Sequence, residues 1–189
     1  MGVKPIQQVK WNGKVVDILV SERRFPRIAD SVIVPVAPNL KLSYGIAKWV
    51  RDATAGKFQI EADRVAPLAP GEAFAGSGGK YRFQHAIGAV VMDETKRYTV
   101  EWIEKSVQNG LRLAAERHAH SCLIADMTED LMRQPQWLSL EERKAICKPV
   151  AKAILQGVRK AAASPEEVGI WVWRSDYKDI WMEALNSQQ

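Results

Sequence analysis

Cysteine is scarce in this chain of 189 residues, which has only Cys122 and Cys147. No metal-ligand spacing surrounds either of them, and the three histidines form no two-histidine-plus-carboxylate pattern. Two cysteines without a secretory context are most simply two small, buried hydrophobic side chains. We therefore expect two unpaired, buried thiols, and neither a metal nor a cofactor.

Long apolar runs are also lacking. A membrane-spanning helix needs about 20 consecutive apolar residues, and no window of this sequence provides them. Residues 1–12 lack the apolar core of a signal peptide. These two absences predict a cytoplasmic protein that does not contact a membrane.

A strong charge of either sign is missing as well. The chain has 27 Lys plus Arg against 22 Asp plus Glu, a formal net charge of +5. This mild excess favours contact with phosphate groups, but it falls far short of the basic tracts of a dedicated nucleic-acid binder. Tryptophan, by contrast, is abundant, with seven residues. Most of these side chains must be partly buried, because each carries a large apolar area.

Short apolar runs alternate with amphipathic segments along the chain. We expect strands at residues 14–20, 31–36, 82–92, 121–125 and 169–173, and helices at residues 44–55, 100–118, 140–163 and 175–185. Pro35 should end the hydrogen-bonded part of its strand, Ser175 should cap the last helix, and the glycine-rich residues 76–79 should form a hairpin-like turn. Ligands of such a sheet bind beyond the carboxyl ends of its strands, here the loops after Val36, Ala125 and Trp173.

Several stretches together resemble the macro domain family, the fold that binds ADP-ribose. They are Val-Ile-Val-Pro-Val-Ala-Pro-Asn at 32–39, the glycine-bounded helix at 45–56, Gly-Glu-Ala at 71–73, His-Ala-Ile-Gly at 85–88 and Val-Trp-Arg-Ser-Asp-Tyr at 172–177. The resemblance runs from about Lys14 to Leu185. It implies an N-terminal extension at 1–13 and one macro-like α/β domain at 14–189, with three α/β/α layers and a mixed, mainly parallel sheet.

The two phosphate-binding loops depart from the family pattern. Consecutive glycines precede the first helix in the family, whereas here the first loop contributes only Gly45. The second loop, residues 126–137, contains no glycine. It places Asp126, Glu129 and Asp130 near the position that the resemblance implies for a diphosphate. Carboxylates there would repel an anion unless they coordinate a metal or point outward.

The resemblance implies ligand contacts in the first loop. Asn39 is the nearest counterpart of an asparagine that orients the distal ribose, although it could instead serve only to form a turn. Gly45 and Ile46 open a helix whose backbone N–H groups can hold a phosphate, although they could instead be a plain helix start.

Three further candidates lie at the ends of other strands. Trp173 would stack under an adenine, or it is a core side chain beside Trp171. Glu22 would contact the adenine, or it is a solvated charge. Asp126 begins the second loop and completes the set of candidate ligand-binding residues, which contains no identified catalytic residue and no metal ligand.

Two functions therefore remain open. The first is a divergent macro-like domain that binds ADP-ribose or a related nucleotide or phosphate ligand in the cleft at the carboxyl ends of the strands. The alternative is a macro-like domain without nucleotide binding that acts through a protein or RNA surface. Catalysis is not expected from the altered loops, and any activity would be ADP-ribosyl hydrolysis.

Overall fold

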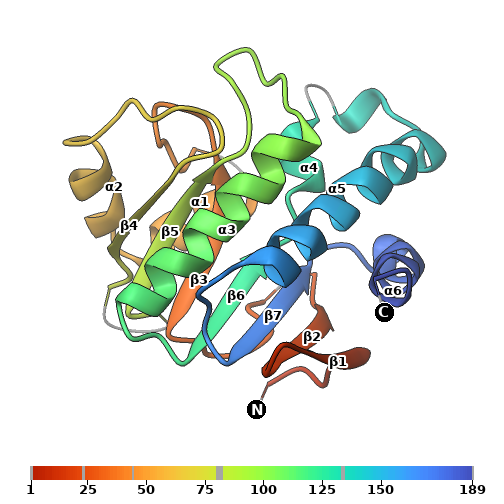
Figure 1. The fold of residues 1–189 in the computed structure, drawn as a ribbon. Coiled ribbons are helices and arrows are strands. Elements are labelled where there is room, and N and C mark those ends of the chain that lie inside the picture. The colour runs from red at the N-terminus through yellow and green to blue at the C-terminus, as the bar shows by residue number, and fades with distance from the viewer. Residues whose placement is uncertain (1, 23, 44, 80–82, 133–134, 189) are drawn as a thin grey trace.

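The computed structural model describes residues 2–22, 24–43, 45–79, 83–132 and 135–188. They form one sheet in the order β1-β2-β7-β6-β3-β5-β4, with helices on both of its faces (Figure 1). The strands are β1 Gln7–Trp11, β2 Lys14–Val20, β3 Ser31–Val36, β4 Ala73–Ser77, β5 His85–Val90, β6 Ser121–Ala125 and β7 Glu167–Val172. The helices are α1 Gly45–Ala53, α2 Lys57–Ala62, α3 Val100–Glu116, α4 Thr128–Leu131, α5 Leu140–Lys160 and α6 Lys178–Asn186, and short 3-10 turns span Pro135–Trp137 and Ser175–Tyr177.

The predicted three-layer α/β/α architecture is confirmed. The inner strands β2, β7, β6, β3 and β5 are parallel, whereas the edge strands β1 and β4 are antiparallel to their neighbours. One apolar core packs α3, α5 and α6 against one face of the sheet, and a second packs α1 and α2 against the other (Figure 1). Because β7, β6 and β3 are adjacent and parallel, their carboxyl ends lie together, as predicted.

The central strands follow from their apolar sequences. All six residues of β3 are buried, as expected for a strand covered on both faces. The pairing of β3 ends before Pro35 on the side of β6 but not on the side of β5. Pairing with β6 stops at Ile33, but pairing with β5 continues through Pro35 to Val36. The prediction that Pro35 ends the hydrogen-bonded part of the strand was therefore wrong on the β5 side, where the proline has no N–H to donate but the strand remains in register.

Some elements escaped prediction. Strand β1 lies within the predicted N-terminal extension and pairs with β2, and β4 and the short helix α2 were also missed. The glycine-rich residues 76–79 include the end of β4 and lead from it toward its antiparallel partner β5. The predicted helix start at Tyr44 and strand start at Arg82 lie outside the described residues.

Both cysteines are buried and unpaired, as predicted. Burial raises the pKa of the Cys122 thiol to about 12 and also raises that of Cys147, so neither is a ready nucleophile. Within the described residues, no group of His, Cys, Asp and Glu side chains could hold a metal ion. None of the described helices is long and apolar enough to cross a membrane.

Candidate functional site

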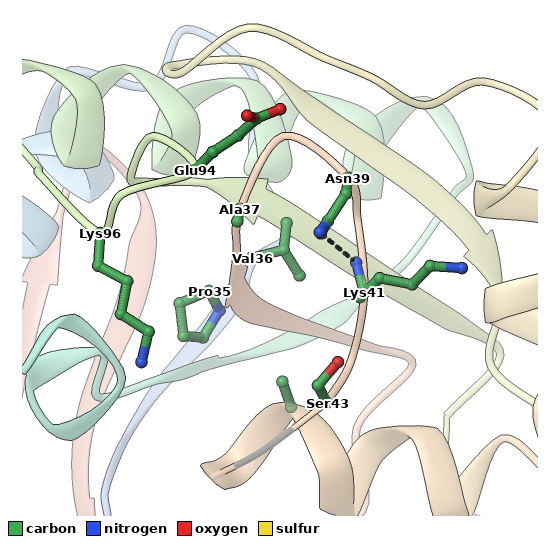
Figure 2. A pocket seen from close by; sticks show the side chains of 9 residues that line it. Pro35, Val36, Ala37, Asn39, Lys41, Ser43, Glu94 and Lys96 are labelled. Carbon is green, nitrogen blue, oxygen red and sulfur yellow. Dashed lines mark hydrogen bonds between the residues drawn. The ribbon is translucent and has the colours of Figure 1, made fainter. Parts of the chain in front are cut away.

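A cavity of about 180 Å³ opens at the carboxyl end of β3 (Figure 2). Its wall comes from the end of β3 and the following loop (residues 35–43), from Ala47 of α1, and from Glu94 and Lys96 in the loop after β5. This is the edge of the sheet where the topology predicts ligand binding. The polar lining consists of two lysines, Lys41 and Lys96, together with Asn39, Ser43 and Glu94.

The loop after β3 is a tight turn that presents Asn39 and Lys41. The N–H of Leu40 donates to the carbonyl of Ala37 at 2.9 Å, and the backbone N–H of Lys41 donates to Oδ1 of Asn39 at 3.1 Å (Figure 2). Leu40 has a φ of +55°, a strained value for a side-chain-bearing residue, and its fully buried side chain anchors the turn. Asn39 therefore forms the turn, and it also lines the cavity.

The loop after β5 positions Lys96. Oδ1 of Asp93 accepts hydrogen bonds from the backbone N–H groups of Thr95 at 2.8 Å and Arg97 at 2.9 Å, and the Arg97 side chain donates to Oδ2 at 2.8 Å. Desolvation raises the pKa of Asp93, but these hydrogen bonds outweigh it and lower that pKa to about 2. Lys96 itself has a φ of +60°, a strained backbone that this Asp93-centred turn maintains.

The charged residues of the lining are Lys41, Lys96 and Glu94. Nζ of Lys41 lies 2.6 Å from Oδ1 of Asp63, but both side chains are about half exposed, so this ion pair is weak and exchangeable. Lys96 extends from the opposite wall (Figure 2). A compact ammonium group on a flexible stem suits a phosphate, so Lys96 is a candidate anion-binding residue, whereas the Lys41 ammonium is turned toward Asp63, away from Lys96 (Figure 2).

The start of α1 meets a carboxyl group from α4. Gly45, the first residue of α1, has a φ of +57°, and a side chain built on it would collide with Oδ1 of Asp130. Asp130 is 3% exposed, and its Oδ1 has no hydrogen-bond partner among the residues that the structure describes. Burial, and then the neighbouring Asp126 and Glu129, raise the pKa of Asp130 to about 8, against the opposing influence of Lys96.

The other carboxylates of the second loop have partners inside the protein. Asp126 is buried, and its Oδ1 accepts hydrogen bonds from the backbone N–H and the hydroxyl of Thr128. Burial nevertheless raises the pKa of Asp126 to about 6. Glu129 accepts a hydrogen bond from the hydroxyl of Tyr177 and lies 3.8 Å from Arg143. Of the three carboxylates that the sequence places in this loop, only Asp130 is directed at α1.

Two predicted residues lie at the ends of β2 and β7. Glu22 accepts hydrogen bonds from the backbone N–H of Ser175, at 2.9 Å, and from its hydroxyl. The Ser175 hydroxyl therefore donates its hydrogen bond to Glu22, and the prediction that Ser175 caps the last helix was wrong. Trp173 is half-buried, with its ring centroid 4.8 Å from that of Trp49 and 5.6 Å from that of Trp171.

Sequence reasoning thus identified one part of the site and missed another. Asn39 lines the cavity, and Gly45 and Ile46 open α1 beside it, with the Ile46 side chain buried in the core. Lys41 and Lys96 were not predicted. The only sequence signal for Lys96 is the Asp-Glu-Thr-Lys-Arg segment at 93–97, whose aspartate is typical of a turn.

Comparisons with known proteins bear on the fold. No protein-family model matches the sequence, and no curated protein matches it significantly. The Oceanobacillus iheyensis macrodomain with ADP superimposes with a TM-score of 0.74 at 14% identity, over 96% of this chain and 95% of that chain. The Trypanosoma brucei macrodomain in complex with ADP-ribose gives a TM-score of 0.69 at 11% identity, over 90% of this chain and 68% of that chain. Over nearly its whole length, therefore, this chain has the macrodomain fold.

Proposed function

We propose that this chain binds a sugar phosphate or nucleotide of the ADP-ribose class in the cavity at the end of β3. The observation that carries the proposal is the placement of Lys96 on one wall of that cavity and of Asn39 and Ser43 on the wall across from it (Figure 2). The ammonium group of Lys96 suits a phosphate, and the amide and hydroxyl groups suit the hydroxyl groups of a ribose. Structures of the same fold that hold ADP and ADP-ribose support this choice of ligand class.

The size of the cavity favours the ribose-phosphate end of such a ligand. Drug-sized ligands occupy pockets of roughly 300–1,000 Å³, whereas this cavity measures about 180 Å³. A ribose bearing one phosphate is therefore a better match than a complete dinucleotide. ADP-ribose contains a second phosphate and an adenosine in addition to the ribose 5-phosphate group. We expect its affinity to be lower than these added groups would suggest if they all made contacts.

Binding without turnover is the proposed outcome. Oδ1 of Asn39, whose counterpart would orient a ribose in a hydrolase, accepts a hydrogen bond from the Lys41 backbone instead. Asp126 is buried and its carboxylate is turned toward Thr128, so it is not placed to act as a general base at the cavity. Neither buried thiol is placed to act as a nucleophile.

Calorimetric titration of the wild-type chain with ribose 5-phosphate tests the proposal. Lys96→Ala should weaken binding about tenfold or more, because a hydrogen bond to a charged group contributes about 1.5–3 kcal/mol. Lys10→Ala is the matched control, since it removes the same charge from the exposed edge strand β1 and should leave the affinity unchanged. If the wild type binds neither ribose 5-phosphate nor ADP-ribose, the nucleotide proposal fails, and a protein or RNA surface becomes the function to pursue.

A further inference from the structure

We propose that Asp130 is a specificity-determining residue: its carboxyl group occupies the anion position at the start of α1 and thereby excludes a diphosphate from the cleft. This inference rests on the proposed function, because it defines which phosphate ligands the cavity accepts. It predicts that the intact chain holds a single phosphate beside Lys96, and that removal of the Asp130 side chain opens the path to a second.

The start of α1 has the properties of an anion site. The first N–H groups of a helix have no partner within it, and the helix dipole adds partial positive charge there. Backbone amides at such a terminus bind phosphate when nothing covers them. Gly45, the first residue of this nine-residue helix, has no side chain to cover it. The Asp130 carboxyl fills the space that a side chain on Gly45 would have taken.

The state of the Asp130 carboxyl is the second, independent observation. Its Oδ1 is buried and has no hydrogen-bond partner in the described part of the chain, although buried polar atoms are almost always paired and an unpaired one costs about 1–3 kcal/mol. Asp130 therefore lies at the helix start without contributing a hydrogen bond through this atom. A carboxyl held in this way takes up the space of an anionic ligand group and also keeps that group out.

Local structure explains why Asp130 points at α1. The side chain of Asp126 accepts hydrogen bonds from Thr128 and so fixes the turn that starts α4 immediately after β6. Glu129 is directed away, toward the hydroxyl of Tyr177 on the α6 side. Helix α4 is only four residues long, so this arrangement leaves Asp130 facing Gly45.

The charged groups around Asp130 define the consequence for ligands. Asp126 and Glu129 on its own side are acidic, whereas the positive charge of Lys96, in the loop after β5, acts on it in the opposite sense. Lys96 also lines the cavity, so its charge bears on both the proposed phosphate position and Asp130. With Asp130 truncated, a second phosphate could extend from the cavity past Lys96 to the α1 backbone.

Calorimetry with inorganic pyrophosphate, at one pH and one low ionic strength, tests this inference. We expect Asp130→Ala to bind pyrophosphate at least about tenfold more tightly than the wild type does. Glu129→Gln is the matched control, because it removes a neighbouring negative charge but opens no space at Gly45, and its affinity should stay close to that of the wild type. The inference is overturned if Asp130→Ala gains no affinity, or if Glu129→Gln gains as much.

Two additions keep the test decisive. If far-UV circular dichroism shows that Asp130→Ala is unfolded, Asp130→Ser supplies a second truncation, to which the same two outcomes apply. Ribose 5-phosphate is titrated in parallel, since its binding to the wild type reports on the proposed function. Wild-type binding of ribose 5-phosphate without a gain in Asp130→Ala would refute only the role of Asp130, and the reverse pattern would refute only the proposed function.

Discussion

Oδ1 of Asp130 lies in the space that a β-carbon on Gly45 would occupy, so a carboxyl group from α4 is seated directly on the first residue of α1. The two residues are 85 positions apart in the numbering of the chain. They meet because β6, which precedes α4, pairs with β3, which precedes α1. This contact is the main way in which the site differs from an open anion-binding helix start.

The Asp130–Gly45 contact predicts strong coupling between substitutions at these positions. Gly45→Ala should destabilise the chain by about 2–4 kcal/mol, because it adds a steric collision to the strain of a positive φ. In the double variant with Asp130→Ala the collision disappears, and only the backbone strain of about 1–2 kcal/mol should remain. Urea unfolding of the four proteins measures this coupling. Strictly additive effects would show that the two residues do not interact.

The raised pKa of Asp130 predicts a stability that falls with rising pH. An unfolded aspartate titrates near its ordinary pKa of about 3.9, whereas the pKa of Asp130 in the fold is raised to about 8. Between about pH 4 and pH 8 the folded chain therefore keeps a proton that the unfolded chain releases, and the free energy of unfolding decreases as pH rises.

Asp130→Asn should remove this contribution. Comparing the free energy of unfolding at pH 6 and pH 8.5 isolates the contribution of Asp130. The pKa of Asp126 is raised to about 6, so most of the stability lost through Asp126 is lost below pH 6. We expect the wild type to lose more stability than Asp130→Asn over this interval, by an amount on the order of one to a few kcal/mol. Equal losses in the two proteins would contradict the raised pKa.

Trp173 supplies a test of where an adenine would lie. If the base stacks on this half-buried ring, Trp173→Ala should weaken the binding of AMP, which carries a single phosphate, by about 1–3 kcal/mol, the usual contribution of base stacking. Ribose 5-phosphate has no base, so its affinity should be unchanged in the same variant. An equal loss for both ligands would mean that Trp173 acts only by packing against Trp49 and Trp171.

The wild-type chain should show no removal of ADP-ribose from a modified protein above background. Positioning of the reacting groups can supply about 7–11 kcal/mol of barrier reduction in ideal cases. In this chain Asn39 is engaged in its own turn and Asp130 fills the start of α1. Incubation with an ADP-ribosylated protein and detection of released ADP-ribose provides the measurement. Robust turnover that Asn39→Ala abolishes would contradict a binding-only site.

The central part of the fold was predictable from sequence and its edges were not. The fully buried, mostly apolar β3 and the short β6 lie between two helical layers, so burial dictates their composition, and their predicted limits match the structure. The edge strands β1 and β4 carry exposed, polar or glycine residues, so their patterns do not distinguish them from loops. The six-residue α2 is too short for its periodicity to stand out.

The candidate site was predictable only in part, for a similar reason. The resemblance singled out Asn39, which lines the cavity, and Gly45, which is the first residue of α1. Lys96 reaches the cavity because a turn held by several hydrogen bonds to Asp93 positions it. No spacing rule in the sequence reveals that turn. The sequence also placed three acids in the second loop, but the direction of each depends on partners from distant elements.

The measurement that most directly tests the account is the affinity of the wild-type chain and of Asp130→Ala for ADP-ribose, determined by calorimetry in one buffer. The account predicts micromolar or weaker binding by the wild type, and an increase of at least about tenfold when the Asp130 side chain is removed. Sub-micromolar binding by the wild type, with no gain in Asp130→Ala, would show that a diphosphate passes the start of α1 unhindered and would contradict the account.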